Sequence, residues 1–536
     1  MNKQTQMEFA NISRLFQAGK IKQAKAAVDR ALLKQPRAFF LHNMAGAIDG
    51  TMGNWQEARK HFQKAVKIHP KSFEAFRNLG NADRALGDLT AAQKHLIKAL
   101  QINPRFATGW CSIGNVYQDK GQIEKALDAF RKALKIKPDF PEAAIYLMEQ
   151  LDRSNLLEEL REAINHTKQA MPSNPIVILF EGVMLDRGQK YEAAKEKLDS
   201  LYFDSTQSLA DASLELMRLN RLAKINDHLL FADDAYAQFL KANALNKNKL
   251  ASPRVSASRY VDGLDARLSY YQPGFSKRWE HAADTSEAPV FMVGFPRSGT
   301  TLLDTFLRGH SEISVIEEAP FVYEIKNELG VEKNLDFSIL DAVSPEKLAA
   351  VGKAYLHRKA SAYKAPITID KLPLNLAYAG EILRVFPNAK FIFSIRDPAD
   401  AVFSAFMQSF KLNDAMATFD TPENAANTYD KSFKIWNLIV DELGPQVITC
   451  KYEDLISAPE QTIERLVEFL GVEMEQAMLE HQKTANSRTH ISTSSYAQVV
   501  QPLYTSAKGR WERYAHLMPE AVKILAPWRK EFGYSD

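Results

Sequence analysis

Small and helix-breaking residues recur with one fixed period along the amphipathic N-terminal part of the chain. Prolines occur every 34 residues, at Pro36, Pro70, Pro104, Pro138 and Pro172. Glycines keep the same spacing at Gly19, Gly53, Gly87 and Gly121. Two alanine columns follow it too, Ala24, Ala58, Ala92 and Ala126, then Ala31, Ala65, Ala99 and Ala133. Four columns in one register indicate an internal repeat.

Each column has a physical role in a helix hairpin. Glycine ends the first helix, because a left-handed C-cap is sterically easy only for glycine. Alanine lets the second helix approach its neighbours, and proline ends that helix because it cannot continue the hydrogen-bond ladder. One hairpin cannot bury its apolar face alone, so successive hairpins must stack. The pattern resembles the tetratricopeptide repeat over about residues 5–208, with Asn155 in a glycine position, and residues 209–246 are expected to cap the array.

Further along the chain, the pattern changes to short apolar runs separated by helical segments. The runs Pro289–Gly294, Lys390–Ile395 and Val447–Lys451 have the length and composition of buried strands. Strands that alternate with helices predict an α/β domain with a parallel sheet. The chain is therefore expected to be multidomain. The expected parts are an all-α repeat solenoid (1–246), a linker rich in polar residues and helix breakers (247–287), and an α/β domain with a P-loop-like element (288–536).

The first predicted strand leads directly into a loop with the composition of an anion site. The loop and the start of the next helix read Phe295-Pro296-Arg297-Ser298-Gly299-Thr300-Thr301. Backbone N–H groups converge at a helix N-terminus, where the helix dipole adds about half a positive charge. The loop has no lysine in the place where nucleoside-triphosphate loops carry one. It therefore suits one terminal 5′-phosphate that carries a reactive group, and it does not require a metal.

A second anion-binding element follows the predicted strand Lys390–Ile395. Arg396 leaves this strand, and Ser404 comes eight residues later, two turns into the following helix. These side chains can converge on one phosphate, because contacts between arginine and phosphate are charge-assisted and directional.

Together the two elements resemble the nucleotide site of sulfotransferases that use 3′-phosphoadenosine 5′-phosphosulfate (PAPS) and release the bisphosphate PAP. The resemblance implies that Arg297, Ser298, Gly299, Thr300 and Thr301 hold the 5′-phosphosulfate. It also implies that Arg396 and Ser404 hold the 3′-phosphate. One branch of the family has a further arginine four residues after the serine, where this chain has Gln408.

Other motifs are similar to the tyrosylprotein sulfotransferases over about residues 288–535. Glu318 comes 21 residues after Arg297, the spacing of that branch's catalytic base, and Glu317 is expected to be a solvated neighbour. The resemblance implies that Lys371 meets the bridging oxygen of the donor and that Ser495 assists the leaving group. It also implies that Tyr452 and Arg510 contact the nucleotide.

Two local differences bear on the chemistry and the acceptor. Pro373 stands where cytosolic sulfotransferases have a catalytic histidine, which favours a glutamate base. The stretch Ala319–Glu324 contains no arginine. In the tyrosylprotein branch, the catalytic glutamate is followed by basic residues that bind acidic peptides.

Composition narrows the remaining possibilities. The net charge of +3 gives no general reason to expect a nucleic-acid partner. The two cysteines, Cys111 and Cys450, fall in different predicted domains, so a disulfide or a cysteine metal site is not expected. The sequence shows neither a signal peptide nor a run of about 18 apolar residues. These features favour a cytoplasmic protein without a membrane span or a bound metal.

The leading interpretation is a PAPS-dependent sulfotransferase acting on an acceptor hydroxyl, with protein tyrosine as one candidate. The repeats would bind a protein or peptide partner, or the substrate itself, and dimerisation and simple structural support are the other roles considered for them. Saccharide or lipid O-sulfation is an alternative, as is a non-catalytic repeat module that responds to nucleotide. An ATP-dependent phosphotransferase is disfavoured by the lysine-free loop.

Overall fold

The computed structural model describes residues 3–280, 288–362, 365–487 and 508–534. The chain forms two compact units, Met1–Leu201 and Tyr202–Asp536. Within the described ranges, no helix has both the length and the hydrophobicity that crossing a membrane requires.

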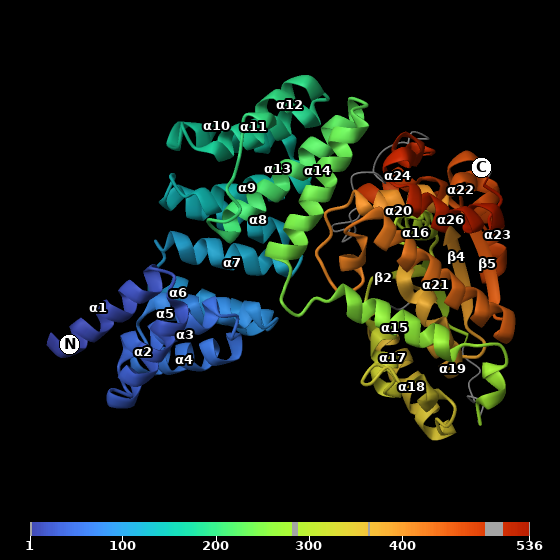
Figure 1. Ribbon diagram of the computed structural model, residues 1–536, viewed down its shortest axis with the longest axis horizontal. Helices are drawn as coiled ribbons and strands as arrows, with labels where there is room; N and C mark the ends of the chain where they lie inside the picture. The colour runs from blue at the N-terminus through green and yellow to red at the C-terminus, as the bar shows by residue number, and fades with distance from the viewer. Residues whose placement is uncertain (1–2, 281–287, 363–364, 488–507, 535–536) are drawn as a thin grey trace. The chain divides into compact units, whose positions relative to one another are not determined.

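The first unit is a solenoid of helix hairpins (Figure 1). Its helices are α1 (Lys3–Gln17), α2 (Ile21–Lys34), α3 (Phe39–Thr51), α4 (Trp55–Ile68), α5 (Phe73–Ala85), α6 (Leu89–Ile102), α7 (Ala107–Asp119), α8 (Ile123–Ile136), α9 (Pro141–Arg153), α10 (Leu157–Ala170), α11 (Pro175–Arg187) and α12 (Tyr191–Asp199). The predicted repeat architecture is therefore confirmed.

The periodic residues have the predicted positions in these hairpins. Gly19, Gly53, Gly87 and Gly121 all have positive φ angles, between +69° and +83°, at the turn between paired helices. The left-handed turn continues where glycine is absent, since Asn155 has φ +56° and Gln189 has φ +57°. The eight periodic alanines are buried between the helices. The fifth and sixth hairpins thus keep the backbone geometry of the repeat without its glycine.

The second unit contains a five-stranded sheet in the order β2-β3-β1-β4-β5, and every neighbouring pair is parallel. The strands are β1 (Val290–Gly294), β2 (Ile313–Glu317), β3 (Ile367–Lys371), β4 (Lys390–Ile395) and β5 (Gln446–Lys451). This confirms the predicted parallel α/β architecture. The strands β2 and β3 were not among the runs identified from the sequence.

Helices cover both faces of this sheet (Figure 1). The α-helices are α13 (Leu209–His228), α14 (Ala232–Leu245), α15 (Ala257–Tyr270), α16 (Thr300–Leu307), α17 (Phe321–Leu329), α18 (Pro345–Ala362), α19 (Ala379–Val385), α20 (Pro398–Phe406), α21 (Pro422–Leu443), α22 (Tyr452–Ser457), α23 (Pro459–Leu470), α24 (His481–Ser487) and α26 (Pro519–Glu531). The other helical segments are η1 (Asn246–Leu250), η2 (Phe275–Arg278), η3 (Phe337–Leu340), η4 (Pro373–Tyr378), η5 (Met416–Phe419), η6 (Gln476–Leu479) and η7 (Arg510–Leu517).

Alternate residues of each central strand enter two different cores. Met292 and Ile392 pack with α16 and α23 on one face, whereas Phe291 and Phe391 belong to a larger cluster with α20 and α21 on the other face. A strand that is buried on both sides explains why its sequence reads as a continuous apolar run.

The compact units do not divide the chain at residue 246, where the sequence placed the end of the repeat domain. Ala223 on α13 and both Ala235 and Phe239 on α14 belong to the large core of the second unit. The α13–α14 hairpin has a helical pattern like that of a repeat, but its apolar side packs within the α/β unit. Sequence periodicity shows that a helix has a buried face and does not show which domain buries it.

The segment expected as a linker is also largely packed. Arg267 on α15 is only 2% exposed and contacts Glu381 at 2.7 Å and Glu332 at 2.8 Å. Tyr271 donates a hydrogen bond of 2.9 Å to the other oxygen of Glu381. Residues 257–271 are therefore part of the α/β unit.

Candidate active site

The loop between β1 and α16 is the first candidate anion cradle. Its backbone is left-handed at Arg297 (φ +73°) and at Gly299 (φ +87°). A Cβ atom on Gly294 would lie 2.3 Å from the carbonyl oxygen of Ser394, and one on Gly299 would lie 2.5 Å from the Tyr452 ring. Both positions therefore require glycine.

The predicted loop residues come together at the N-terminus of α16. Ser298, Thr300 and Thr301 are at most 6% exposed, and the loop is held by a 2.8 Å hydrogen bond from the Ser394 hydroxyl to the Ser298 carbonyl. The first turn of α16 thus presents hydroxyls and main-chain N–H groups in one place, as an oxyanion site requires.

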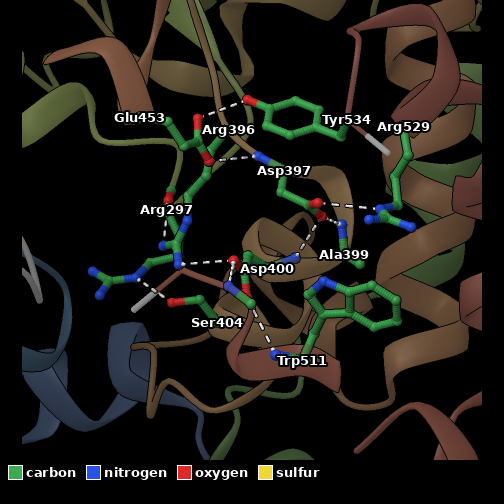
Figure 2. A network of polar contacts seen from close by, with 11 residues as sticks. Arg297, Arg396, Asp397, Ala399, Asp400, Ser404, Glu453, Trp511, Arg529 and Tyr534 are labelled. Atoms are coloured by element: carbon green, nitrogen blue, oxygen red, sulfur yellow. Dashed lines mark hydrogen bonds and ion pairs between the residues drawn. The ribbon is translucent and has the colours of Figure 1, made fainter. Parts of the chain in front are cut away.

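The second cradle lies beside the first, since β1 and β4 are neighbours in the sheet. The Nε of Arg297 donates a 3.1 Å hydrogen bond to the Ser404 hydroxyl, and Arg396 reaches the Arg297 carbonyl oxygen at 3.4 Å (Figure 2). The structure therefore brings Arg297 together with Arg396 and Ser404, although Arg297 is far from both in the sequence.

Tyr452 lies between the two cradles. Its ring contacts the position of Gly299, and its centre is 5.0 Å from the guanidinium carbon of Arg396. An arginine over an aromatic face gains a cation–π attraction that helps to fix both groups. This placement agrees with a residue that flanks a nucleotide.

A network of carboxylates holds the turn that carries Arg396 (Figure 2). Asp397 caps α20 by accepting the Ala399 N–H at 2.8 Å, and it also accepts from Arg529 at 3.1 Å. Glu453 accepts the main-chain N–H of Asp397 at 3.2 Å and the Tyr534 hydroxyl at 2.7 Å. The C-terminal helix and tail thus hold the second cradle in place.

Lys371 ends β3 and is fully buried beside the first cradle. Its ammonium group lies 3.1 Å from Glu317 and 3.3 Å from Asp304, which is on α16. Asp304 also pairs with Arg308, the residue that directly follows α16. A buried cation needs such compensation because desolvating a charge is costly.

Glu318 follows β2 in a left-handed conformation, with φ +53°. Its N–H donates a 2.9 Å hydrogen bond to the Lys371 carbonyl, so the candidate base is tied to the strand end that carries the candidate lysine. The residue is open to solvent. The surrounding protein nevertheless removes part of the hydration of its carboxyl group, and this desolvation raises the pKa. The positive charge of Lys371 opposes the rise, whereas the negative charges of Glu317 and Asp304 add to it. A carboxylate with a raised pKa is a better proton acceptor near neutral pH.

The remaining two candidates are less closely tied to this site. Arg510 is at the start of η7, and its guanidinium pairs with Asp227, which also accepts from Arg513 at 2.9 Å and Tyr514 at 2.6 Å. Ser495 lies outside the described residues.

Two acidic residues of the site were missed from the sequence. Glu317, expected as a solvated neighbour, contacts Lys371 directly. Asp304 was not singled out, although it is a lone carboxylate in the otherwise uncharged helix Thr300–Leu307 and is 0% exposed. A carboxylate inside an apolar helix next to a phosphate loop is the signal that could have revealed it.

The site therefore combines two adjacent oxyanion cradles, a buried lysine and a carboxyl with a raised pKa, all beyond the carboxyl ends of parallel strands. Residues 289–476 match the model of the sulfotransferase family. This segment is a sulfotransferase-family domain. Residues 80–121 and 107–140 match tetratricopeptide-repeat models, so the chain joins a repeat array to that domain.

Relatives of the chain are distant. An uncharacterized protein of Aquifex aeolicus is 30% identical over 307 residues, which are 55% of this chain and 39% of the relative. The protein-tyrosine sulfotransferase of Drosophila melanogaster is 24% identical over 293 residues, which are 49% of this chain and 52% of the relative. The chain thus spans at most about half the length of these two curated relatives.

The chain also shows a similarity to a solved structure. The crystal structure of a tetratricopeptide repeat protein from Parabacteroides merdae is 18% identical, with a TM-score of 0.37. The similarity covers 46% of this chain and 95% of that chain.

Proposed function

We propose that the protein is a sulfotransferase that moves a sulfuryl group from PAPS to an acceptor hydroxyl. The observation that carries the proposal is the meeting of Arg297, Arg396 and Ser404 beside the N-terminus of α16. Two oxyanion cradles on neighbouring strands suit a nucleotide with a phosphate at each end. The family match of residues 289–476 supports the same reaction class.

The described residues fit such a donor. The glycines at positions 294 and 299 leave room that a Cβ would fill, and the buried hydroxyls of Ser298, Thr300 and Thr301 can donate to a 5′-phosphate. Arg396 and Ser404 can hold the 3′-phosphate through charge-assisted hydrogen bonds. When bound, PAPS would supply the sulfuryl group and depart as PAP.

The catalytic roles follow from the positions of the chain's own groups. Glu318 would take the proton of the acceptor hydroxyl, because its raised pKa matches this task and its main chain is fixed by Lys371. Lys371 would place positive charge where negative charge grows on the departing oxygen. Ser495 is proposed to assist there as well, on the resemblance alone.

The proposal extends to the acceptor and to the role of the repeats. Protein tyrosine is the first candidate, because the Drosophila relative carries the name protein-tyrosine sulfotransferase. A saccharide or lipid hydroxyl is the alternative, since Ala319–Glu324 lacks the basic residues expected beside an acidic peptide. The repeats would bind a partner protein or present the substrate.

The test has two steps, binding and turnover. Calorimetry should show that the full chain binds PAP, and Arg396→Ala should weaken that binding roughly 10-fold or more. Incubation with PAPS and a panel of tyrosine peptides, glycans and lipids should then yield a product heavier by one SO3 group. Absence of PAP binding would refute the proposal, and binding without any product would favour a nucleotide-responsive module.

A further inference from the structure

Asp400 is a buried carboxylate at the back of the second cradle. It is 2% exposed, and both of its oxygens accept main-chain hydrogen bonds (Figure 2). The N–H of Gly509 reaches Oδ2 at 2.7 Å, and the N–H of Trp511 reaches Oδ1 at 3.2 Å. The guanidinium of Arg396 lies 3.7 Å from Oδ2, in an ion pair one helical turn apart.

The two main-chain contacts flank a single residue, Arg510. One carboxylate therefore fixes the backbone on both sides of Arg510 and, at the same time, faces Arg396. The two arginines come from segments more than a hundred residues apart, and Asp400 is a bridge between them. This arrangement links the β4–α20 turn to the start of η7.

Burial of a carboxylate is expensive unless its oxygens are satisfied. Burial raises the pKa of Asp400, while Arg396 and the N–H groups of Gly509 and Trp511 act in the opposite direction. An apolar residue at this position would leave the N–H groups of Gly509 and Trp511 without their acceptor, so the carboxylate stabilises the local main chain. Because the same carboxylate faces Arg396, the fixed main chain is tied to the second cradle.

We propose that Asp400 is a positioning residue that holds Arg396 and the Arg510 segment in register for the 3′-phosphate of the donor. This proposal rests on the proposed function, because it assumes a 3′-phosphorylated nucleotide. Asp400 would act through the geometry of the two segments and would not touch the nucleotide itself.

Charge and geometry predict opposite outcomes for Asp400→Asn. If Asp400 acted only as a nearby negative charge, its neutralisation would tighten the binding of an anion. If it acts by position, the new amide nitrogen faces a main-chain N–H, because a carboxylate accepts at both oxygens and an amide at only one. A donor facing a donor displaces the Gly509–Trp511 segment and misaligns the cradle.

The experiment compares two nucleotides on the full chain. The dissociation constants of PAP and of adenosine 5′-phosphate, which lacks the 3′-phosphate, are measured by calorimetry for wild type and for Asp400→Asn. We expect the variant to lose roughly 10-fold in PAP affinity and little in adenosine 5′-phosphate affinity. In an Arg396→Ala background, the same substitution should cause a smaller further loss than in the wild type, because part of the effect of Asp400 passes through Arg396.

Glu381→Gln is the matched control, since it neutralises another fully buried carboxylate in the same unit, the partner of Arg267. It should lower the melting temperature without changing the ratio of the two affinities. If Asp400→Asn does not fold, Asp400→Ser serves as a second variant with the same expected loss. An unchanged ratio, or tighter PAP binding, would overturn the positioning role. Failure of the wild type to bind PAP would instead refute the proposed function.

Discussion

Lys371 has an unusual environment for a residue assigned to catalysis. Its ammonium is 0% exposed and lies between the carboxylates of Asp304 and Glu317. The two carboxylates hold the ammonium group in place, and Arg308 also pairs with Asp304, so two positive and two negative charges balance within the cluster. The carboxyl of Glu318 is then influenced by both signs of charge.

Replacing Glu318 by glutamine should separate chemistry from binding. Glutamine keeps the size and the solvent exposure of the side chain but cannot accept a proton, so kcat should fall about 100-fold or more. The affinity for PAP should stay within about 2-fold, because the phosphates are held elsewhere. Glu312→Gln, at an exposed position of the same segment, is the control and should leave both quantities unchanged.

The raised pKa of Glu318 has a measurable consequence. The base works in its ionised form, so kcat/KM should fall with decreasing pH, with a midpoint above the ordinary value for glutamate. Glu317→Gln removes a neighbouring negative charge that raises this pKa and leaves Lys371 less neutralised. Both effects should move the acidic limb to lower pH. A limb that stays in place would show that another group controls it.

Gly299 is the position of the first cradle where added bulk is least tolerable. An alanine there would be strained at φ +87° and would place its Cβ 2.5 Å from Tyr452, so Gly299→Ala should weaken PAP binding by about 10-fold or more. Gly87→Ala is the control, because it has the same backbone strain at φ +83° with no atom within 4 Å of the new Cβ. It should lower stability without affecting calorimetric PAP binding.

The first hairpins of the solenoid share an ionic feature that repeats with the period of the array. In one copy, Asp83 on α5 contacts Arg59 at 2.8 Å and His95 at 2.6 Å. The other copy lies 34 residues earlier, where Asp49 contacts Lys25 at 3.1 Å and His61 at 3.6 Å. In each case a buried aspartate on the first helix of a hairpin pairs with a positively charged side chain from the preceding hairpin. These contacts fix the register between successive hairpins.

Asp83→Asn should therefore destabilise the solenoid more than the loss of a surface pair would. Asp83 is 0% exposed while Arg59 keeps partial exposure, so the expected cost is about 2–3 kcal/mol, slightly below that of breaking a fully buried pair. Asp119→Asn breaks the more exposed pair with Arg84 and should cost under about 1 kcal/mol. Urea unfolding of the full chain, followed by far-UV circular dichroism, distinguishes the two. Equal effects would contradict a stabilising role for the buried aspartate.

Strands of the α/β unit differ in how visible they are in the sequence. The central strand β1 is apolar throughout, and β4 is apolar except at Lys390 and Ser394. Both matched the prediction, β4 over the same residues, Lys390–Ile395. The strands β2 and β3 end in Glu317 and in Asp370-Lys371, and these charges interrupt their apolar runs. Two of these charged residues, Glu317 and Lys371, form an ion pair of the candidate site, whereas Asp370 accepts a hydrogen bond from Tyr355.

The division of the chain yields a prediction about fragments. A fragment that begins at residue 202 keeps Ala223, Ala235 and Phe239 in the α/β core, together with Asp227 for the arginines of η7. It should bind PAP as the full chain does. A fragment that begins at residue 247 loses these groups and should melt at a lower temperature or aggregate. Equal stability of the two fragments would favour the boundary at residue 246.

Much of the candidate site was predictable because loop motifs keep their order and spacing in the sequence. Arg297, Arg396 and Ser404 were identified in this way, and the structure brings them together. The roles of Asp304 and Glu317 were not predictable, since both depend on which side chain meets Lys371 in space. Periodicity likewise revealed the repeats but not where the α13–α14 hairpin packs.

The bond from Ser394 to the main chain of the phosphate loop has an implication for the thermodynamics of ligand capture. The hydrogen bond from the neighbouring strand orders the loop before any anion binds, so binding does not have to order a mobile segment. Little conformational entropy is then lost on association, and more of the intrinsic attraction appears as affinity. Amides of this loop should already be slow to exchange with deuterium in the ligand-free protein.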